Sequence, residues 1–366
     1  MAKLKIPHYI IDKATFPRDK TCGDGLILYA YKALKELDEN LYNNFLKHPK
    51  ILHSRNIKLN ISNDTAINFI ETEKERPQVI SYAKRIDFDN FLVENLSKTY
   101  ANQFFGNPAR KIEKHKEGIY IKLKNGEKIL SKLVIGADGV NSLVAKQLAN
   151  KIINPKKNST FITAYFKDVK HLPKDRTAEI RLVYKGVLLF FYIFPLADGQ
   201  VNVSLVATTH HLQKNNINLI EELEDILNNH PEVSHKFKES TRVSKWRGWS
   251  IPFHFGDENV FGDNFMLVGD AAGLANAFYK EGVGTGMMSG IICAKKIEQC
   301  IQQNNYSASF LKSYEKDLKK EFYKLLKFSR LTLRIARFKR LFLIIIKLFK
   351  KRVEKKAPKM ILKRSY

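Results

Sequence analysis

The chain has 366 residues, 44% of them hydrophobic, so it is long enough for two domains and too apolar to be mainly disordered. Its three widely spaced cysteines exclude a disulfide framework, show no metal-ligand spacing and fit a reducing cytoplasm best. The net charge is +26, but residues 319–366 carry 18 Lys and Arg against 2 acids, so the rest of the chain is only mildly basic.

The sequence carries no mark of secretion or of membrane insertion. No apolar run approaches the roughly 20 residues that a membrane-spanning helix needs. No signal-peptide pattern follows Met1. We therefore expect a cytoplasmic protein, and the charged C-terminal segment needs an explanation of its own.

Residues 1–150 alternate between strand and helix patterns, as α/β proteins do. Apolar spacing and turn signals predict, in chain order, a strand at His8–Ile11, an irregular segment at Phe16–Gly25, a helix from Leu28 to about Leu37, a helix at Phe88–Tyr100, a strand at Gly118–Ile121, a turn at Asn125-Gly126 and a strand at Ile129–Ile135.

Residues 151–255 are strand-rich, and the strand-then-helix order returns from Phe265. The predicted elements of this second region are strands at Phe161–Phe166, Glu179–Tyr184, Val187–Phe194 and Val201–Ala207, a turn at Asp198-Gly199 and a helix at Leu219–Leu227. We therefore predict a discontinuous nucleotide-binding domain of residues 1–150 and 256–305. A β-rich domain of residues 151–255 is inserted in it, and a helical tail of residues 306–366 follows.

A first segment with chemical meaning is Leu133-Val134-Ile135-Gly136-Ala137-Asp138-Gly139-Val140-Asn141-Ser142. A buried strand ends in two glycines that allow a tight turn, and Asn141 or Ser142 can cap the helix that follows. Such a turn suits contact with a phosphate or a ribose. Any strand-turn-helix crossover also needs glycine here, so by itself the segment favours both interpretations equally.

A second segment runs from Phe265 through Gly269-Asp270-Ala271-Ala272-Gly273 to Glu281-Gly282-Val283-Gly284. Asp270 ends a buried strand, where ligands bind in open α/β sheets, and its carboxylate suits a sugar or ribityl hydroxyl. Gly282 and Gly284 open a helix whose N-terminus favours negative charge. Close packing of helix on sheet explains the small residues equally well, but it does not explain Asp270.

Together the two segments resemble the paired GADG and GDAAG motifs of a flavoprotein group that includes aromatic hydroxylases and geranylgeranyl reductases. The closest resemblance is to the geranylgeranyl reductase family, because Phe16-Pro17-Arg18-Asp19-Lys20-Thr21-Cys22-Gly23-Asp24-Gly25 is similar to its F-P-R-x-K-x-C-G-[DG]-G segment, and Arg85 to the arginine of its R-x-x-F-D helix start. The resemblance covers residue 4 to about residue 300.

This resemblance implies an α/β fold with a glutathione-reductase-type, Rossmann-like FAD-binding domain, an inserted β-rich substrate domain and a helical tail. It implies FAD as cofactor, with NAD(P)H or another donor to reduce it. Candidate cofactor-binding positions are Asp12, Arg18, Cys22, Gly23, Asp24, Gly25, Arg85, Gly136, Asp138, Gly139, Gly269, Asp270, Ala271, Gly273, Gly282, Val283 and Gly284. The substrate positions are Phe190, Tyr192 and Phe194, and Cys22 and Tyr192 are the candidate proton donors.

The sequence departs from the family pattern in three places. The family's Y-x-W-x-F-P strand reads Phe190-Phe191-Tyr192-Ile193-Phe194-Pro195, which keeps the aromatic lining but replaces two members. The family begins with a strand and G-x-G-x-x-G, which is absent here, so we expect the chain to lack the first strand of the fold and to bind FAD weakly. The family's D-P-x-x-G-E-G reads Asn276-Ala277-Phe278-Tyr279-Lys280-Glu281-Gly282, with Lys280 in place of a glycine beside the flavin. That lysine either pairs with the flavin or obstructs the site.

The basic tail has apolar residues at three- and four-residue spacing from Phe322 to Phe349 and predicts one amphipathic helix. We expect it to lie on an anionic membrane surface, with the protein peripheral to the membrane. The alternatives are docking on the protein body and nucleic-acid binding, of which the second is disfavoured.

Three functions remain open from the sequence. The first is an FAD-dependent reductase of double bonds in an isoprenoid or lipid-like substrate. The second is an FAD-dependent NAD(P)H monooxygenase, which shares every cofactor motif. The third is a non-catalytic remnant that binds membranes or nucleic acid.

Overall fold

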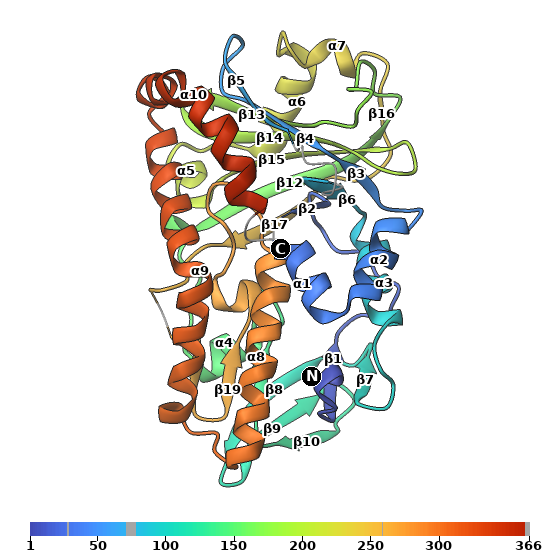
Figure 1. Cartoon of the computed structure of the whole chain (residues 1–366), viewed down its shortest axis with the longest axis vertical. Helices are drawn as coiled ribbons and strands as arrows, with labels where there is room; N and C mark the ends of the chain where they lie inside the picture. Colours follow the sequence, from blue (N-terminus) through green and yellow to red (C-terminus); the bar gives the residue numbers. More distant parts are fainter. Residues whose placement is uncertain (28, 71–77, 258, 363–366) are drawn as a thin grey trace. The chain divides into compact units, whose positions relative to one another are not determined.

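The computed structural model describes residues 1–27, 29–70, 78–257 and 259–362. These residues form two units, each built from discontinuous segments (Figure 1). Unit 1 comprises residues 1–18, 89–154 and 252–329, and unit 2 comprises residues 19–88, 155–251 and 330–366. Each unit is described by itself below.

Parallel strand pairs form the centre of unit 1. Strand β1 (His8–Asp12) pairs in parallel with β7 (Ala101–Phe105), and β11 (Val134–Gly136) pairs in parallel with β19 (Phe265–Leu267). The other elements of this unit are the 3-10 helices η1 (Ala2–Leu4) and η3 (Gly269–Ala272), β8 (Ala109–His115), β9 (Gly118–Leu123), β10 (Lys128–Ser131), β18 (Phe261–Gly262), α4 (Leu143–Leu148) and α8 (Val283–Gln303).

An eight-stranded sheet organises unit 2, in the order β16-β12-β15-β14-β13-β4-β5, with β17 on β12. Its strands are β4 (Asn56–Asn60), β5 (Ala66–Ile70), β12 (Asn158–Lys167), β13 (Ala178–Lys185), β14 (Val187–Pro195), β15 (Val201–Thr208), β16 (Thr241–Arg242) and β17 (Arg247–Pro252). The remaining elements are β2 (Gly25–Ile27), β3 (Leu52–Ser54), β6 (Ile80–Tyr82), α1 (Tyr29–Leu37), α2 (Glu39–Lys47), η2 (Pro155–Lys157), α5 (Thr209–Lys214), α6 (Leu219–Asn229) and α7 (Ser234–Phe237).

The two faces of this sheet differ in chemistry. Val203 and Leu205 of β15 and Phe191 and Ile193 of β14 lie in a core cluster with the apolar residues of α6. Because side chains alternate along a strand, the intervening residues Tyr192, Asn202 and Ser204 lie on the other face. That second face therefore combines aromatic and polar side chains, and all three of these residues are buried.

Helices α3 (Arg85–Glu94) and α9 (Ala308–Ala336) each contain residues of both units. Helix α10 (Lys339–Leu362) belongs to unit 2. Of the described helices, none is both long and apolar enough to cross a membrane.

Most predicted elements are confirmed within a few residues, and three expectations need correction. Ile129–Ile135 is not one strand, because β10 pairs with β9 and β11 with β19. The helix expected to reach Tyr100 ends at Glu94. The tail is two helices, α9 and α10, rather than one. The helix expected from Leu28 to about Leu37 is confirmed as α1 over Tyr29–Leu37, and residue 28 lies outside the described residues.

The grouping of segments also differs from the predicted domain boundaries. Residues 19–88, expected with the nucleotide-binding domain, group with the β-rich segment. The reason is that β4 pairs in parallel with β13 and β5 pairs with β4, so both extend the large sheet. Which function each domain serves stays a prediction.

Candidate functional site

In unit 1 two predicted motifs meet at one edge of a parallel sheet. Strand β11 pairs with β19 so that Gly136 lies opposite Leu267, and the turns after both strands leave from the same edge. The carboxyl ends of parallel strands are where α/β proteins bind ligands. The segments around Asp138 and Asp270 are thus neighbours.

The turn after β19 is held close to helix α8. Gly269 has φ +55, a value that L side chains rarely adopt, and a Cβ built there would lie 3.3 Å from Gly286 Cα. The Gly269 amide donates to Ser289 Oγ at 3.0 Å. Ala271 is buried, and Gly273 ends the turn with φ +69. Glycines are required here for close backbone approach, so packing of the turn on the helix explains much of this motif.

Asp270 lies beside the N-terminus of α8. A Cβ at Gly282 would come within 3.1 Å of Asp270 Oδ1, so the missing side chain leaves room for the carboxylate. Glu281 Oε1 accepts a hydrogen bond from the Gly284 amide at 2.5 Å. Burial, with a smaller contribution from Asp270, raises the pKa of Glu281 to about 7. The site therefore combines a half-buried acceptor for hydroxyls with the positive end of a 21-residue helix at Val283.

The polar groups around Asp270 and the N-terminus of α8 fit FAD in two respects. The carboxylate of Asp270 suits a ribityl hydroxyl, and the helix N-terminus with Gly282 and Val283 suits a negatively charged ring edge. A Cβ at Gly282, which glycine lacks, would narrow the space beside Asp270.

The motif at Gly136–Ser142 mainly caps the N-terminus of helix α4. Asp138 Oδ2 accepts from the Leu143 amide at 2.6 Å and Ser142 Oγ from the Ala145 amide at 3.0 Å, so both side chains cap α4. A Cβ at Gly136 would clash with Leu267 Cδ2 at 2.6 Å. Gly139, with φ +78, has no atom within 4 Å of an added Cβ. Of the two glycines, Gly139 is therefore the one with open space beside it.

At the end of β1, Asp12 and Arg18 form a small charged cluster. Arg18 donates to Asp89 Oδ2 at 2.5 Å and lies 3.8 Å from Asp12 Oδ2, with its guanidinium over the ring of Phe16. Asp12 Oδ1 accepts from the Ala14 amide. Both predicted residues are thus held in place at the carboxyl end of a parallel strand.

In unit 2 the Cys22–Gly25 loop lies against the aromatic and polar face of the large sheet. A Cβ at Gly25 would lie 2.9 Å from Phe194 Cε2, and one at Gly23 would lie 3.7 Å from Ser204 Oγ. Asn202 Nδ2 donates to the Cys22 carbonyl at 3.0 Å. The close approach of residue 25 to the Phe194 ring requires glycine there, which explains the last glycine of the motif.

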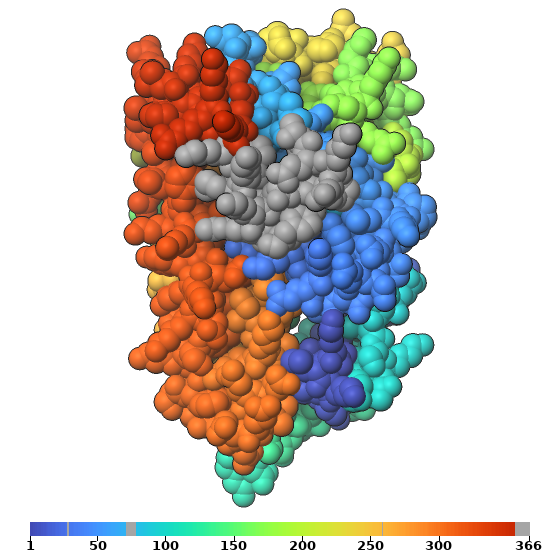
Figure 2. All heavy atoms as spheres, in the orientation of Figure 1, coloured from blue at the N-terminus to red at the C-terminus, as the bar shows by residue number. Residues whose placement is uncertain are grey.

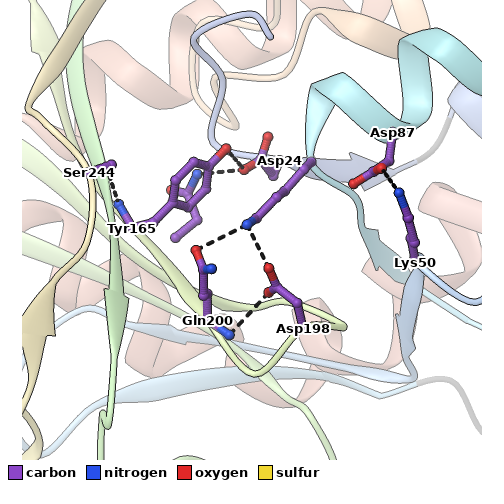
Figure 3. Close-up of polar contacts among 9 residues, drawn as sticks. Asp24, Lys50, Asp87, Tyr165, Asp198, Gln200 and Ser244 are labelled. Atoms are coloured by element: carbon purple, nitrogen blue, oxygen red, sulfur yellow. Dashed lines mark hydrogen bonds and ion pairs between the residues drawn. The ribbon is translucent and has the colours of Figure 1, made fainter. Parts of the chain in front are cut away.

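Asp24 is the buried acid of this loop. Its Oδ2 accepts from the Tyr165 hydroxyl at 2.9 Å and from Asn202 Nδ2 at 2.8 Å (Figure 3). Burial raises the pKa of Asp24 to about 7, against the smaller lowering effects of Asn202, Tyr165 and Arg85. The carboxyl therefore changes protonation near neutral pH.

The predicted substrate residues share one face of β14. Phe190, Tyr192 and Phe194 are all buried, and the ring of Phe194 lies 5.5 Å from those of Tyr192 and Tyr82. Burial raises the pKa of the Tyr192 hydroxyl and of the half-buried Cys22 thiol, although Arg85 opposes the rise at Cys22. Both predicted proton donors are thus neutral at physiological pH.

Comparison with known proteins identifies the family. A family model described as an FAD binding domain matches residues 38–329. The chain belongs to this family. It is an FAD-dependent oxidoreductase, and the predicted resemblance to the geranylgeranyl reductases is confirmed by named relatives of that type.

Two relatives and two solved structures illustrate this placement. The chain is 26% identical over 314 residues to a menaquinone reductase of Mycobacterium tuberculosis, covering 79% of this chain and 70% of the relative. It is 27% identical over 252 residues to a digeranylgeranylglycerophospholipid reductase of Methanococcus vannielii, covering 65% of this chain and 60% of that relative.

The fold matches a geranylgeranyl bacteriochlorophyll reductase-like protein of Thermoplasma acidophilum, with TM-score 0.80 and 20% identity over 93% of this chain and 85% of that one. It also matches halogenase PltM in complex with FAD, with TM-score 0.75 and 13% identity over 93% of this chain and 74% of that one. At these identities the likeness shows the fold shared by FAD binding domain proteins.

Sequence reasoning missed three members of the site, namely Glu281, Tyr165 and Asn202. Glu281 lies within a quoted motif, and its place one residue before a helix-opening glycine was a usable signal for a cap. Tyr165 and Asn202 are 141 and 178 residues from Asp24 in sequence. Nothing in their local sequence marks them. Lys280, at φ +59, lies over the Phe253 ring at 5.4 Å, so its place relative to the cofactor stays open.

Proposed function

We propose that this protein reduces carbon–carbon double bonds of an isoprenoid or lipid-like substrate. The supporting observation is the aromatic face of β14, where Phe190, Tyr192 and Phe194 are buried next to the Cys22–Gly25 loop. Such a face suits a long apolar chain and excludes water from it. The names of the relatives, a menaquinone reductase and a digeranylgeranylglycerophospholipid reductase, support a substrate of this class.

In this proposal each unit has a distinct task. When bound, FAD supplies a hydride for one alkene carbon after reduction by NAD(P)H or another donor. Asp270 would accept a hydrogen bond from a hydroxyl of the cofactor's ribityl chain, and the α8 N-terminus at Gly282 and Val283 would stabilise negative charge. Asp12 would accept a hydrogen bond from a ribose hydroxyl. The aromatic side chains of β14 hold the substrate chain away from water.

An anaerobic single-turnover experiment tests the proposal. The FAD-loaded protein, reduced with dithionite, is mixed with digeranylgeranylglycerophospholipid or with menaquinone in detergent micelles. We expect flavin reoxidation and a product that is still heavier by two hydrogens per bond reduced after air has reoxidised any quinol, and no reaction with the fully saturated lipid. NAD(P)H-dependent oxygen uptake coupled to hydroxylation would instead establish the monooxygenase, and failure to bind flavin at all would favour the non-catalytic alternative.

We further propose that helix α10 docks the protein on an anionic membrane surface. One side of α10 packs on unit 2, where Phe342 and Ile346 are buried. The outer side carries Leu341, Ile344 and Leu348, which are 48%, 57% and 74% exposed. The exposed cations Arg340, Lys347 and Lys351 lie among them, and Figure 2 shows atoms of α10, in red, at the surface. An apolar stripe with flanking cations matches the membrane interface.

The double variant Ile344→Asp, Leu348→Asp tests this docking. Burying each of these side chains contributes about 1.5–3 kcal/mol, so we expect vesicle binding to fall by about 100-fold or more. The readout is cosedimentation with vesicles containing phosphatidylserine. The matched control is Ile152→Asp, the same kind of change at a residue that is 85% exposed in unit 1. Equal loss in both variants, or salt-sensitive binding to duplex DNA without vesicle binding, would overturn the proposal.

A further inference from the structure

The buried Asp24 has two carboxyl oxygens in different environments. Oδ2 accepts from Tyr165 of β12 and from Asn202 of β15, while Oδ1 is buried without a hydrogen-bond partner among the described residues. The residue as a whole is 0% exposed. A buried polar atom that lacks a partner costs free energy, so its retention needs an explanation.

Hydrogen bonding determines which oxygen carries the proton. Two donors, a hydroxyl and an amide, already point at Oδ2, so a proton on that oxygen would have to displace one of them. Asn202 in turn is fixed, because its Oδ1 accepts from Thr163 at 2.8 Å and from Ser204 at 2.7 Å. The neutral form of Asp24 therefore has its proton on Oδ1, the oxygen that no described residue hydrogen-bonds.

The charged and titratable groups around Asp24 come from several elements. Asp19 and Cys22 precede it on its own segment, Arg85 faces it from α3, and Tyr165 contacts it from β12. Lys84 lies over the Tyr165 ring at 4.7 Å but is paired with Asp198 at 2.6 Å and Gln200 at 3.0 Å. Arg85 stabilises the charged form of Asp24 and burial stabilises the neutral form, so these two effects oppose each other.

The position of Asp24 also places it next to the aromatic face. Tyr165 and Asn202 lie on the same side of the sheet as Tyr192, opposite the core packed against α6. The next residue, Gly25, is in close contact with Phe194. An apolar chain on that face would thus lie beside the carboxyl.

We propose that Asp24 is the proton donor of the reduction, an inference that rests on the proposed function. The π bond of the alkene breaks as one carbon receives the hydride and the neighbouring carbon receives the Oδ1 proton. Asp24 is left as a carboxylate on which Tyr165 and Asn202 continue to donate, and solvent reprotonates it after product leaves. The two electrons come from the flavin, and the hydrogens added are one hydride and one proton.

Asp24 suits this task better than the two donors predicted from sequence. A general acid works best when its pKa is near the operating pH. The pKa of Asp24 is about 7, whereas burial raises those of Cys22 and Tyr192 above their ordinary values. Cys22 and Tyr192 are then residues that line the site.

A first test needs no turnover. In the infrared difference spectrum of wild type minus Asp24→Asn, in which the contribution of Glu281 cancels, we expect the carbonyl band of a protonated carboxyl that shifts in D2O and titrates away near pH 7. Asparagine is the matched replacement because it tolerates the left-handed backbone of Asp24, with φ +63, and keeps an acceptor for Tyr165. If wild type and variant have the same spectrum at pH 5, Asp24 is ionised and the proposal fails.

The second test uses the anaerobic single turnover with digeranylgeranylglycerophospholipid. We expect Asp24→Asn to lower the rate by at least about 100-fold and to abolish the decline in rate that wild type shows above pH 7. Asp24→Gly also tolerates the backbone and leaves space, so formate should restore part of its rate, with no such effect on Asp24→Asn. A structural role alone would give no rescue and would preserve the pH profile.

The outcomes separate the two proposals. If wild type reduces the lipid and Asp24→Asn reduces it at the same rate, the proton-donor assignment is wrong while the reductase stands. If wild type reduces neither the lipid nor menaquinone, the proposed function itself is wrong and the donor assignment falls with it.

Discussion

Burial raises the pKa of two carboxyl groups, Asp24 in unit 2 and Glu281 in unit 1, to about 7, but the hydrogen bonds around them differ. Glu281 sits at a helix start, where Oε1 accepts from the Gly284 amide at 2.5 Å. Asp24 sits on a loop over a sheet, where side chains from two strands donate to one oxygen and the other oxygen has no partner in the described chain.

The difference shows that a shifted pKa alone does not identify a functional acid. The Glu281 carboxyl accepts a hydrogen bond from a backbone amide in the first turn of α8, as the side chain of a helix-capping residue does. At Asp24 one oxygen has no hydrogen-bond partner among the described residues. Geometry around the group, rather than the shift itself, distinguishes a structural acid from a candidate proton donor.

The largest predicted effect concerns the pH dependence of stability. Both carboxyls hold protons in the folded state that the unfolded chain releases from about pH 4 upward, so their contribution to stability is greatest below about pH 4 and is lost as pH rises to about 7. Each group contributes about 1.4 kcal/mol per pH unit within that window, or roughly 2–3 kcal/mol between pH 5 and pH 8. Above pH 7 the contribution levels off.

Urea unfolding at pH 5 and pH 8 checks this prediction. Glu281→Gln and Asp24→Asn should each reduce the difference in unfolding free energy between the two pH values by that amount. Glu127→Gln, at an exposed carboxylate in the turn between β9 and β10, is the control and should leave the difference unchanged. A full pH dependence in Glu281→Gln would mean that Glu281 is ionised in the folded protein, and the comparison with Asp24 would lose its basis.

A second prediction tests whether the turn at Gly273, in the same unit as Glu281, depends on close backbone packing. Gly273 and Gly139 have similar positive φ values, +69 and +78, so alanine at either costs about 1–2 kcal/mol in backbone strain. At Gly273 the new Cβ would also lie 2.5 Å from His254 Cδ2, whereas at Gly139 it meets nothing within 4 Å. We expect Gly273→Ala to be about 1–3 kcal/mol more destabilising than Gly139→Ala.

A double variant isolates the steric part of this difference. Adding His254→Ala should remove the extra cost of Gly273→Ala but leave Gly139→Ala unaffected, which urea unfolding of the single and double variants measures. If Gly273→Ala and Gly139→Ala lower the free energy of unfolding equally while His254 is present, the turn at Gly273 accommodates a Cβ. Close packing then does not determine its structure.

How much could be predicted from sequence differs between the same two regions. The strand ending at Asp270 and the glycines of the turn could be predicted, because they are contiguous and their conformational demands are local. The partners of Asp24 could not, since they depend on the register in which β15 pairs with β12 and places Thr163 opposite Ser204. That register is determined by tertiary packing.

The helical tail shows the same limit. Its apolar spacing predicts a helix, but the break after Ala336 has no proline or glycine to announce it. In the structure the Tyr184 hydroxyl donates to the Ala336 carbonyl at 2.7 Å, which satisfies one of the acceptors left open at a helix end. Such a contact comes from a strand more than 150 residues earlier in the chain, so the local sequence does not reveal it.

The smallest predicted effect tests the hydrogen bond that orients Asp24. Tyr165 donates to Oδ2 and thereby favours the carboxylate, so Tyr165→Phe should raise the pKa of Asp24. A hydrogen bond of about 1 kcal/mol corresponds to a rise of about 0.5–1 pH unit, measured from the titration of the protonated carboxyl band. Tyr184→Phe removes a buried hydroxyl of the same unit that donates to Ala336 instead, and should leave the titration in place. In turnover, Tyr165→Phe should retain most of the rate below pH 7 and extend it to higher pH, because the acid stays protonated further. A downward shift of the titration would mean that Tyr165 accepts from a protonated Oδ2, and the proton would then not be available on Oδ1.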